Sequence, residues 1–198
     1  MKRGIFIVLE GPDGAGTSTH SDALANRIRA LGKDVILTRE PTEGECGKKV
    51  RKILGEGMYE SPDDLQKLFC DDRAEHVERV IEPGIRAGKI IVCDRYVPST
   101  LIYGEASNVP LLTLKRWNES FPKPDLLFIL LPPFEVVLAR LLKRSTGDPF
   151  EKEHFQKRVY AGYERYSKEH FGVIVVDTSG AKDAVEAKIW ENVSTFLE

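Results

Sequence analysis

Five short runs of apolar and β-branched residues recur along the chain, and each is followed by turn-forming or charged residues. Within each run the apolar residues are continuous and do not alternate with polar ones. Continuous apolarity is typical of strands that are covered on both faces, as in a parallel sheet between helices. The predicted strands are residues 5–9, 35–38, 90–93, 126–131 and 173–176.

Between these runs the apolar residues follow a helical period. In the last stretch, for example, Val185, Ile189 and Val193 recur every four residues. Alternating strands and helices predict a doubly wound α/β domain with a five-stranded parallel sheet, and no repeat, low-complexity tract or linker divides residues 1–198. Helices are predicted near residues 18–31, 47–54, 62–87, 111–120, 135–144, 152–169 and 181–197.

Composition narrows the function classes. The formal net charge of −2 gives no basic field, which argues against nonspecific binding to nucleic acid or to a membrane surface. Cys46, Cys70 and Cys93 are odd in number and lack metal-ligand spacing, so we expect reduced thiols in an intracellular protein. Neither a signal peptide nor an apolar run of membrane-spanning length is evident, and a cytoplasmic location is expected.

A glycine-rich segment joins the first predicted strand to the first predicted helix. Its sequence, Gly-Pro-Asp-Gly-Ala-Gly-Thr-Ser over residues 11–18, matches the phosphate-binding pattern G-x-x-x-x-G-K-[ST] except that Thr17 occupies the lysine position. The glycines and the helix N-terminus offer backbone N–H groups to phosphate oxygens, and Ser18 offers a hydroxyl to Mg²⁺. A purely structural turn, with Asp13 capping local N–H groups, is the alternative.

Polar side chains also follow the second and third predicted strands. Ligands of doubly wound sheets bind beyond the carboxyl ends of the strands, so Arg39 and the pair Asp94-Arg95 are expected near the glycine-rich loop. The guanidinium of Arg95 suits a phosphate clamp, although a structural ion pair with Asp94 is the alternative. Arg39 and Arg51 fit a second phosphoryl group in the same way.

Two further segments suggest how a nucleotide could be held. Phe69 and Arg73 are spaced i, i+4 on one predicted helix, so a ring and a donor fork share a face and could hold a nucleobase, unless Phe69 is simply a core residue. The cationic segment from Arg140 to Pro149 could be a mobile lid, or its charges could merely stabilise a helix C-terminus.

Taken together, these motifs resemble the thymidylate kinase family over nearly the whole chain. The resemblance rests on the 10–16 loop, Arg39-Glu-Pro41, Arg51, Leu68-Phe-Cys-Asp-Asp-Arg73, Asp94-Arg-Tyr96, Ser99, Thr100, Tyr103, Pro122-Lys-Pro-Asp125 and Asp148-Pro-Phe-Glu151. It implies a three-layer P-loop NTPase fold with a lid at about residues 140–152. It also implies transfer of the γ-phosphoryl group of ATP to dTMP for dTTP synthesis, with Mg²⁺, in a homodimer.

The resemblance also implies roles for individual residues. Asp13 and Arg95 would lie next to the transferred group, and Ser18 and Asp94 would serve Mg²⁺. Because Thr17 lacks the charge of the loop lysine, we hypothesise separately that Arg140 or Arg144 closes over the ATP phosphates. The ATP-binding residues would be Gly11, Pro12, Asp13, Gly14, Ala15, Gly16, Thr17, Ser18 and Thr19. The dTMP-binding residues would be Asp13, Arg39, Arg51, Phe69, Arg73, Arg95, Ser99, Thr100 and Tyr103.

Three positions depart from the family pattern: Thr17 replaces lysine, Pro149 replaces a lid arginine, and Gly104 replaces a frequent glutamine. The first two remove positive charge near the donor phosphates. They favour, as one alternative, a nucleotide-binding protein that has lost turnover. Gly104 could leave room in the acceptor site, and a kinase of another pyrimidine deoxynucleoside monophosphate is the second alternative.

Overall fold

The computed structural model describes residues 3–56, 61–143 and 149–197. Its sheet contains five strands, all parallel, in the order β2-β3-β1-β4-β5. The strands are β1 (Ile5–Glu10), β2 (Val35–Arg39), β3 (Ile90–Asp94), β4 (Leu126–Leu130) and β5 (Val173–Val176). The predicted α/β fold is therefore confirmed, and each predicted strand agrees with the observed one to within a residue at either end.

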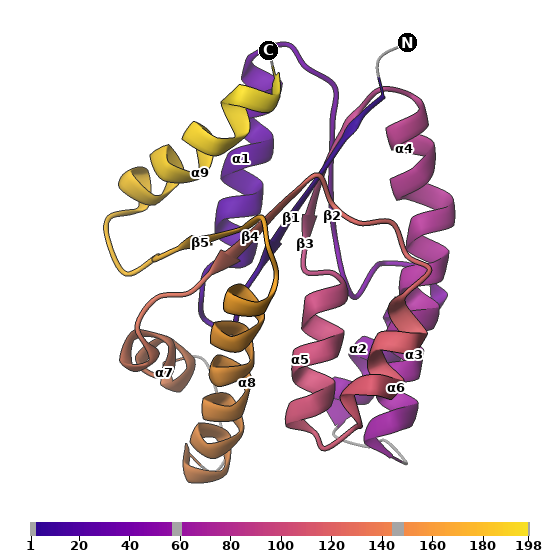
Figure 1. Cartoon of the computed structure of the whole chain (residues 1–198), viewed down its shortest axis with the longest axis vertical. Helices are drawn as coiled ribbons and strands as arrows, with labels where there is room; N and C mark the ends of the chain where they lie inside the picture. The colour runs from indigo at the N-terminus through magenta and orange to yellow at the C-terminus, as the bar shows by residue number, and fades with distance from the viewer. Residues whose placement is uncertain (1–2, 57–60, 144–148, 198) are drawn as a thin grey trace.

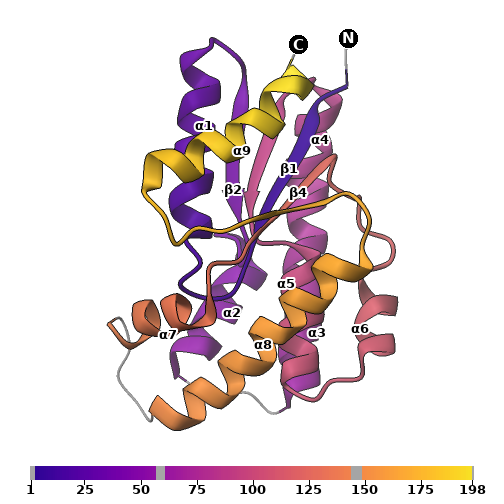
Figure 2. The same ribbon diagram turned by 60° about the vertical axis from the view of Figure 1, so that its left-hand side comes forward.

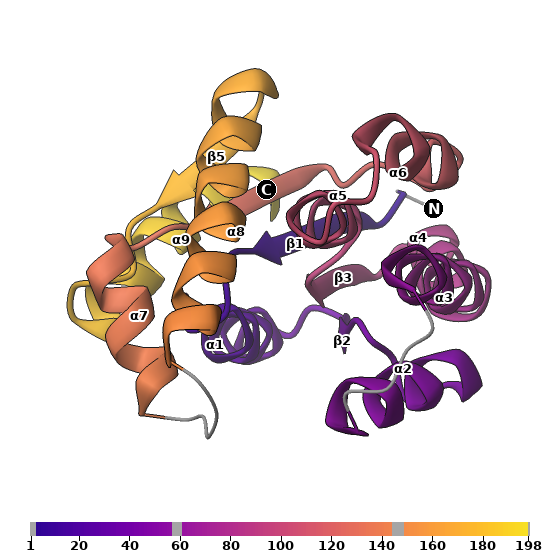
Figure 3. The same cartoon turned by 90° about the horizontal axis from the view of Figure 1, so that it is seen from below.

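Helices cover both faces of the sheet (Figures 1 and 3). Ile7 and Leu9 of β1 pack on one face with α1 (Thr17–Ala30) and α9 (Lys182–Leu197). Phe6 and Val8 point to the opposite face, where they meet η1 (Val77–Ile81) and α4 (Glu82–Arg86), which continue the helix α3 (Pro62–His76). Alternation of side chains along a buried strand thus explains why its residues are apolar on both sides.

The remaining helices extend beyond the carboxyl edge of the sheet. They are α2 (Glu45–Glu56), α5 (Val97–Ala106), α6 (Leu111–Asn118), α7 (Phe134–Leu142) and α8 (Pro149–Glu169). In Figures 1 and 2 α5 and α8 descend from this edge, with α3 and α6 on one side and α7 on the other. Among the described residues, no helix is both long and apolar enough to cross a membrane.

Helix α5 was not predicted from the sequence. Most of its residues are buried, including Pro98, Leu101, Ile102 and Ala106, so it lacks the polar stripe that marks an amphipathic helix. The one available signal was Pro98 in the first turn, because proline is favoured at helix starts. Its position matters because α5 carries several of the predicted site residues.

Strand register brings the predicted polar residues to one edge. Asp94 at the end of β3 lies opposite Leu9 of β1 on one side and Arg39 of β2 on the other. The glycine-rich loop follows β1 directly, so the carboxyl ends of three adjacent strands, β2, β3 and β1, lie side by side. This arrangement confirms that the polar residues after β1, β2 and β3 share a single edge.

Close packing at Gly47 should make α2 intolerant of a side chain there. A Cβ on Gly47 would lie 2.0 Å from the carbonyl oxygen of Thr42, and Thr42 is anchored because its backbone N–H donates to Asp72 at 2.8 Å. We expect Gly47→Ala to lower the free energy of unfolding by about 1–3 kcal/mol, measured by urea denaturation.

Gly55→Ala is the matched control, because Gly55 lies in the same helix and a Cβ there would have no neighbour within 4 Å. Since alanine is the better helix former, this variant should be unchanged or more stable by up to about 1 kcal/mol. Equal effects of the two substitutions would show that the contact with Thr42 does not constrain α2.

Candidate active site

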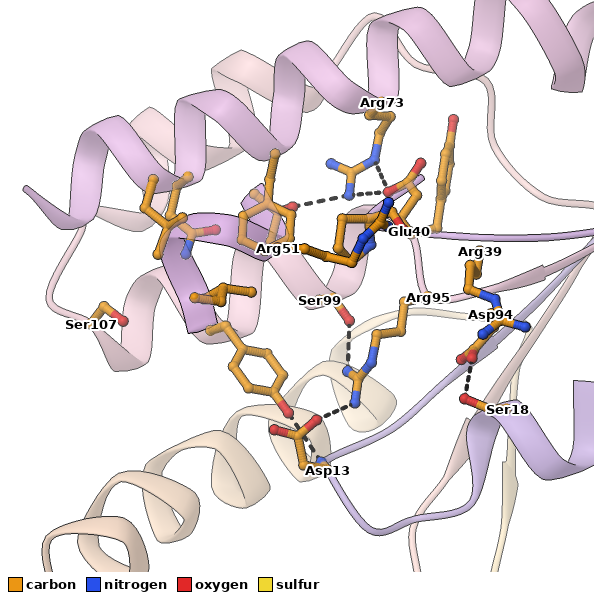
Figure 4. A pocket seen from close by; sticks show the side chains of 18 of the residues that line it. Asp13, Ser18, Arg39, Glu40, Arg51, Arg73, Asp94, Arg95, Ser99 and Ser107 are labelled. Carbon is orange, nitrogen blue, oxygen red and sulfur yellow. Dashed lines mark hydrogen bonds and ion pairs between the residues drawn. The ribbon is translucent and has the colours of Figure 1, made fainter. Parts of the chain in front are cut away.

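A cavity of about 650 Å³ opens at the carboxyl edge of the sheet. Most of the residues predicted to bind the acceptor nucleotide or the metal line it, and Figure 4 shows their side chains converging from the glycine-rich loop, β3, α2, α3 and α5. The predicted residues in its wall are Asp13, Ser18, Arg39, Arg51, Phe69, Arg73, Asp94, Arg95, Ser99, Thr100 and Tyr103.

The glycine-rich loop lies at one end of this cavity. Gly14 and Gly16 have φ of +85° and +94°, in the left-handed region where a side chain is strained. Gly16 forms the N-cap of α1, so the first N–H groups of the helix point out of the loop. Thr17, at the lysine position, is buried in the first turn of α1, whereas the side chains of Ser18 and Thr19 are exposed.

Asp13 connects this loop to the cavity. Its carboxylate accepts a hydrogen bond from Nη2 of Arg95 at 2.6 Å, and its backbone N–H donates to the hydroxyl of Tyr103 at 3.0 Å (Figure 4). Arg95 itself has φ of +70°, an uncommon conformation for a residue other than glycine. Its ion-pair partner is therefore Asp13 and not the neighbouring Asp94, which excludes the structural pair considered from the sequence.

Asp94 instead accepts a hydrogen bond from the hydroxyl of Ser18 through Oδ2. Its Oδ1 is buried and has no hydrogen-bond partner among the described residues. A hydroxyl beside an unpaired carboxylate oxygen suits a hard cation such as Mg²⁺, which binds proteins through one or two such oxygens and completes its shell with phosphate and water. Within the described residues, no group of three or more His, Cys, Asp or Glu residues could hold a metal ion alone.

A second group of contacts supports the opposite wall, formed by α3. Arg73 is 1% exposed and donates to Glu40 through Nε at 2.9 Å and through Nη2 at 2.6 Å. Its Nη2 also donates to Thr100, and its Nη1 donates to Asn118. Four of the five N–H bonds of the guanidinium are thus used within the protein, which leaves one on Nη1.

Glu40 accepts a further contact from His76. The Nδ1 of His76 lies 3.0 Å from Oε1 of Glu40, and its Nε2 lies 2.7 Å from the hydroxyl of Thr38. A carboxylate this deeply buried needs such partners, because an isolated buried charge is strongly unfavourable. Phe69, one turn before Arg73, is only partly buried and presents its ring to the cavity.

The predicted phosphate-binding arginines lie between these two groups. Arg39 is exposed at the end of β2 and lines the cavity. Arg51 donates to the carbonyl oxygen of Pro41 at 2.9 Å and to the carboxylate of Glu43 at 2.8 Å. Together with Arg95, they give the cavity wall three guanidinium groups, the donors that suit a phosphoryl group.

Two arginines of the predicted lid, Arg140 and Arg144, were expected to close over the ATP phosphates. Arg140 lies beside the loop, where two of its five N–H groups donate to the carbonyl oxygens of Gly14 at 3.1 Å and Thr178 at 2.8 Å. Arg144 lies outside the described residues.

The space expected at Gly104 was a wrong prediction. A Cβ there would meet the methyl groups of Leu114 at 2.7 Å and 2.8 Å, so this glycine allows α5 and α6 to approach each other and does not enlarge the acceptor site.

Glu10 is the most important residue that sequence reasoning missed. It is fully buried at the end of β1 and accepts four hydrogen bonds, from the N–H groups of Tyr96 and Ser99, the hydroxyl of Ser99 and the hydroxyl of Tyr163. Burial raises the pKa of its carboxyl, while the charge of Arg95 and these hydrogen bonds act in the opposite direction. An acidic residue ending an apolar strand was the only signal in the sequence.

Comparison with known proteins agrees with this geometry. The family model described as thymidylate kinase matches residues 9–189. The chain belongs to the thymidylate kinase family. A probable thymidylate kinase of Pyrococcus horikoshii is 40% identical over 167 residues, which cover 81% of this chain and 82% of that protein.

Further relatives extend the match over nearly the whole length of the chain. A probable thymidylate kinase of Thermococcus kodakarensis is 34% identical, with 98% of each chain covered. The thymidylate kinase of Xanthomonas oryzae pv. oryzae is 37% identical over 92% of this chain and 79% of its own. The resemblance inferred from the short motifs is thereby confirmed at the level of the family.

The contacts of Glu10 lead to a stability prediction. In Glu10→Gln, an NH₂ group replaces one carboxylate oxygen and leaves the donors that faced it unpaired. Each unpaired buried donor costs about 1–3 kcal/mol, so the free energy of unfolding should fall by at least that much in urea denaturation at pH 7.

The loss of stability in Glu10→Gln should also depend on pH, because Glu10 titrates and glutamine does not. The folded pKa of Glu10 lies above its ordinary value of 4.5, so the native state binds more protons than the unfolded state in the interval between them. The contribution of Glu10 to the free energy of unfolding that comes from this pKa shift is therefore fully present below pH 4.5 and is lost as pH rises through the folded pKa. The difference in free energy of unfolding between the native protein and Glu10→Gln should therefore become smaller as pH rises from 4.5 to the folded pKa. A difference that grows over this pH range would contradict the raised pKa.

Proposed function

We propose that this protein transfers the γ-phosphoryl group of ATP to dTMP, giving dTDP and ADP. The observation that carries the proposal is the contact of Asp13 with both Arg95 and Tyr103, because it joins the phosphate-binding loop to the acceptor cavity. The loop would hold the phosphates of ATP through its backbone N–H groups. The cavity would hold dTMP, with its phosphate toward Arg39, Arg51 and Arg95 and its base on Phe69.

The reaction needs positioning and charge neutralisation more than covalent participation by the protein. An oxygen of the dTMP phosphate attacks the γ-phosphorus of ATP, and the bond from that phosphorus to the bridging oxygen of ADP breaks. Arg95 lies where it could neutralise charge between the two phosphates, since it reaches the loop at Gly11 and Asp13. Ser18 and Asp94 would hold Mg²⁺, which supplies positive charge to the donor phosphates.

Selectivity for a deoxyribose would come from Tyr103. Its hydroxyl is held by Asp13, and the guanidinium of Arg95 lies 5.4 Å from the centre of its ring, so the ring cannot easily withdraw to admit a 2′-hydroxyl. Arg73 would donate its remaining N–H to a carbonyl of thymine. As in the family that the sequence resembles, we also propose a homodimer that works in the cytoplasm.

Incubation of the pure protein with ATP, Mg²⁺ and each pyrimidine deoxynucleoside monophosphate tests the proposal. We expect dTDP formation, with kcat/KM larger for dTMP than for dUMP or dCMP. An active control enzyme and no product from any acceptor would contradict the proposed reaction. Tight binding of ATP and dTMP by calorimetry without turnover would instead indicate a nucleotide-binding protein that has lost catalysis.

Thr17 leads to a second prediction about the same reaction. A fixed donor aimed at developing charge is worth about 3–4 kcal/mol of barrier, or about 10²–10³ in rate, so the missing lysine must be replaced. We propose that Arg140 supplies part of this charge, since it already contacts the loop at Gly14. Arg140→Ala should lower kcat about tenfold or more, and Thr17→Lys should restore part of it.

Rescue by Thr17→Lys separates a charge effect from the loss of loop support, because a lysine at position 17 cannot replace the bond to Thr178. Arg144→Ala with and without Thr17→Lys tests the neighbouring cation in the same assay. Arg86→Ala is the control, since Arg86 pairs with Glu82 on the surface of α4. Near-normal kcat in both Arg140→Ala and Arg144→Ala would contradict the proposal and leave Mg²⁺ and the backbone N–H groups as the main source of positive charge.

A further inference from the structure

Gln66 of α3 is a polar residue in the cavity wall to which the reaction above gives no role. Its side chain lines the cavity, although the residue as a whole is only 3% exposed. Its Oε1 is enclosed and has no hydrogen-bond partner among the described residues. Its Nε2 has no acceptor among the described residues either, and since Gln66 lines the cavity we infer that the NH₂ end of the amide faces it.

An unpaired amide in this position is unusual. Buried polar groups are nearly always hydrogen-bonded, and an exception in the wall of a cavity calls for an explanation. The neighbouring polar side chains in the wall follow the rule, because Arg73 and Thr100 are hydrogen-bonded to each other and Arg73 also to Glu40. Gln66 differs from them, because it lines the cavity and no described residue accepts a hydrogen bond from its Nε2, so that NH₂ group can donate to a molecule inside the cavity.

The position of Gln66 on α3 indicates which part of a base it would meet. Residues 66, 69 and 73 share one face of the helix, and Phe69 lies between the other two. A pyrimidine stacked on Phe69 carries its 4-carbonyl and its 2-carbonyl on either side of N3. If Arg73 serves one carbonyl, the other points along the helix axis toward Gln66.

Gly104 of α5 explains why this amide can reach the base. A Cβ at position 104 would lie 3.1 Å from Cγ of Gln66, closer than most real contacts of this kind. Because position 104 of α5 has no side chain, the side chain of Gln66 has room to lie there. The glycine that was expected to leave space in the acceptor site is instead the surface against which Gln66 packs.

We propose that Gln66 is a base-recognition residue whose Nε2 donates a hydrogen bond to the 2-carbonyl of the pyrimidine, while Arg73 donates to the 4-carbonyl. This proposal rests on the proposed function, because it assumes a pyrimidine nucleotide over Phe69. It adds a contact that is independent of the phosphate-binding arginines and of the sugar-facing Tyr103.

The test compares Gln66→Leu with the native protein for dTMP, 2-thio-dTMP and 4-thio-dTMP. Sulfur is a weak acceptor, so each analogue removes one of the two carbonyl contacts. We expect Gln66→Leu to lower kcat/KM for dTMP and for 4-thio-dTMP about five- to tenfold, mainly through KM. With 2-thio-dTMP the two proteins should differ by less than about twofold, because the contact is already lost.

Gln156→Leu of α8 is the matched control. Its Oε1 is likewise buried without a partner among the described residues, but Gln156 is not part of the cavity wall, so the kinetics should be unchanged. Equal losses for Gln66→Leu with all three substrates would mark Gln66 as a packing residue and overturn the proposal, as would no loss with any of them.

Calorimetric binding of the three nucleotides gives the same comparison without turnover. If native protein failed to phosphorylate dTMP, the proposed reaction would be contradicted, while the ratio of dissociation constants for dTMP and 2-thio-dTMP would still decide the role of Gln66. A thermal denaturation scan completes the set, because exchanging an unpaired buried amide for an apolar side chain should not lower Tm.

Discussion

The buried carboxylate of Glu10 is the contact on which the rest of the site depends. It lies at the end of the central strand, where a charge without partners would be strongly unfavourable, and it obtains those partners from two helices that are distant in sequence. Its bonds to Tyr96 and Ser99 fix the start of α5. Because Arg95 immediately precedes that start and donates to Ser99, the carboxylate also determines where the guanidinium lies.

The cavity wall formed by α3 also depends on a buried charged side chain and its partners. Here the buried group is the cation of Arg73, whereas at the end of β1 it is the anion of Glu10. Arg73 combines a structural role, through Glu40 and Asn118, with one remaining donor for a base. A side chain held by four bonds has little freedom left to lose when a ligand arrives, so the entropic cost of binding is reduced. The same bonds mean that Arg73 cannot be altered without disturbing the helix that carries Phe69.

The sequence was informative wherever a signal is local. Continuous apolar runs predicted every strand, and the polar residues that follow β1, β2 and β3 predicted the edge at which the cavity lies. The helix carrying Ser99, Thr100 and Tyr103 was missed because burial on nearly all sides removes the amphipathic pattern. Asn118 and Tyr163 were missed because their partners come from other elements, and no spacing in the sequence encodes such contacts.

Departures from a family pattern were also hard to interpret from sequence alone. Gly104 suggested empty space, yet its neighbour is Leu114 on another helix. The sequence also could not show that Arg140, expected to close over the ATP phosphates, donates to two backbone carbonyls beside the loop. The direction in which a side chain or Cα faces depends on how helices pack, which only the three-dimensional structure provides.

The separation of bonded residues along the chain has a consequence for folding. The hydroxyl of Tyr163 reaches Glu10 across 153 positions, and the guanidinium of Arg95 reaches Asp13 across 82. Contacts between such distant residues form late, since the intervening chain must first be ordered. During synthesis the loop near the N-terminus therefore emerges long before the helix that completes its surroundings. A nucleotide that needs the whole cavity would bind only the finished fold, and by doing so it would favour that fold over every partly formed state.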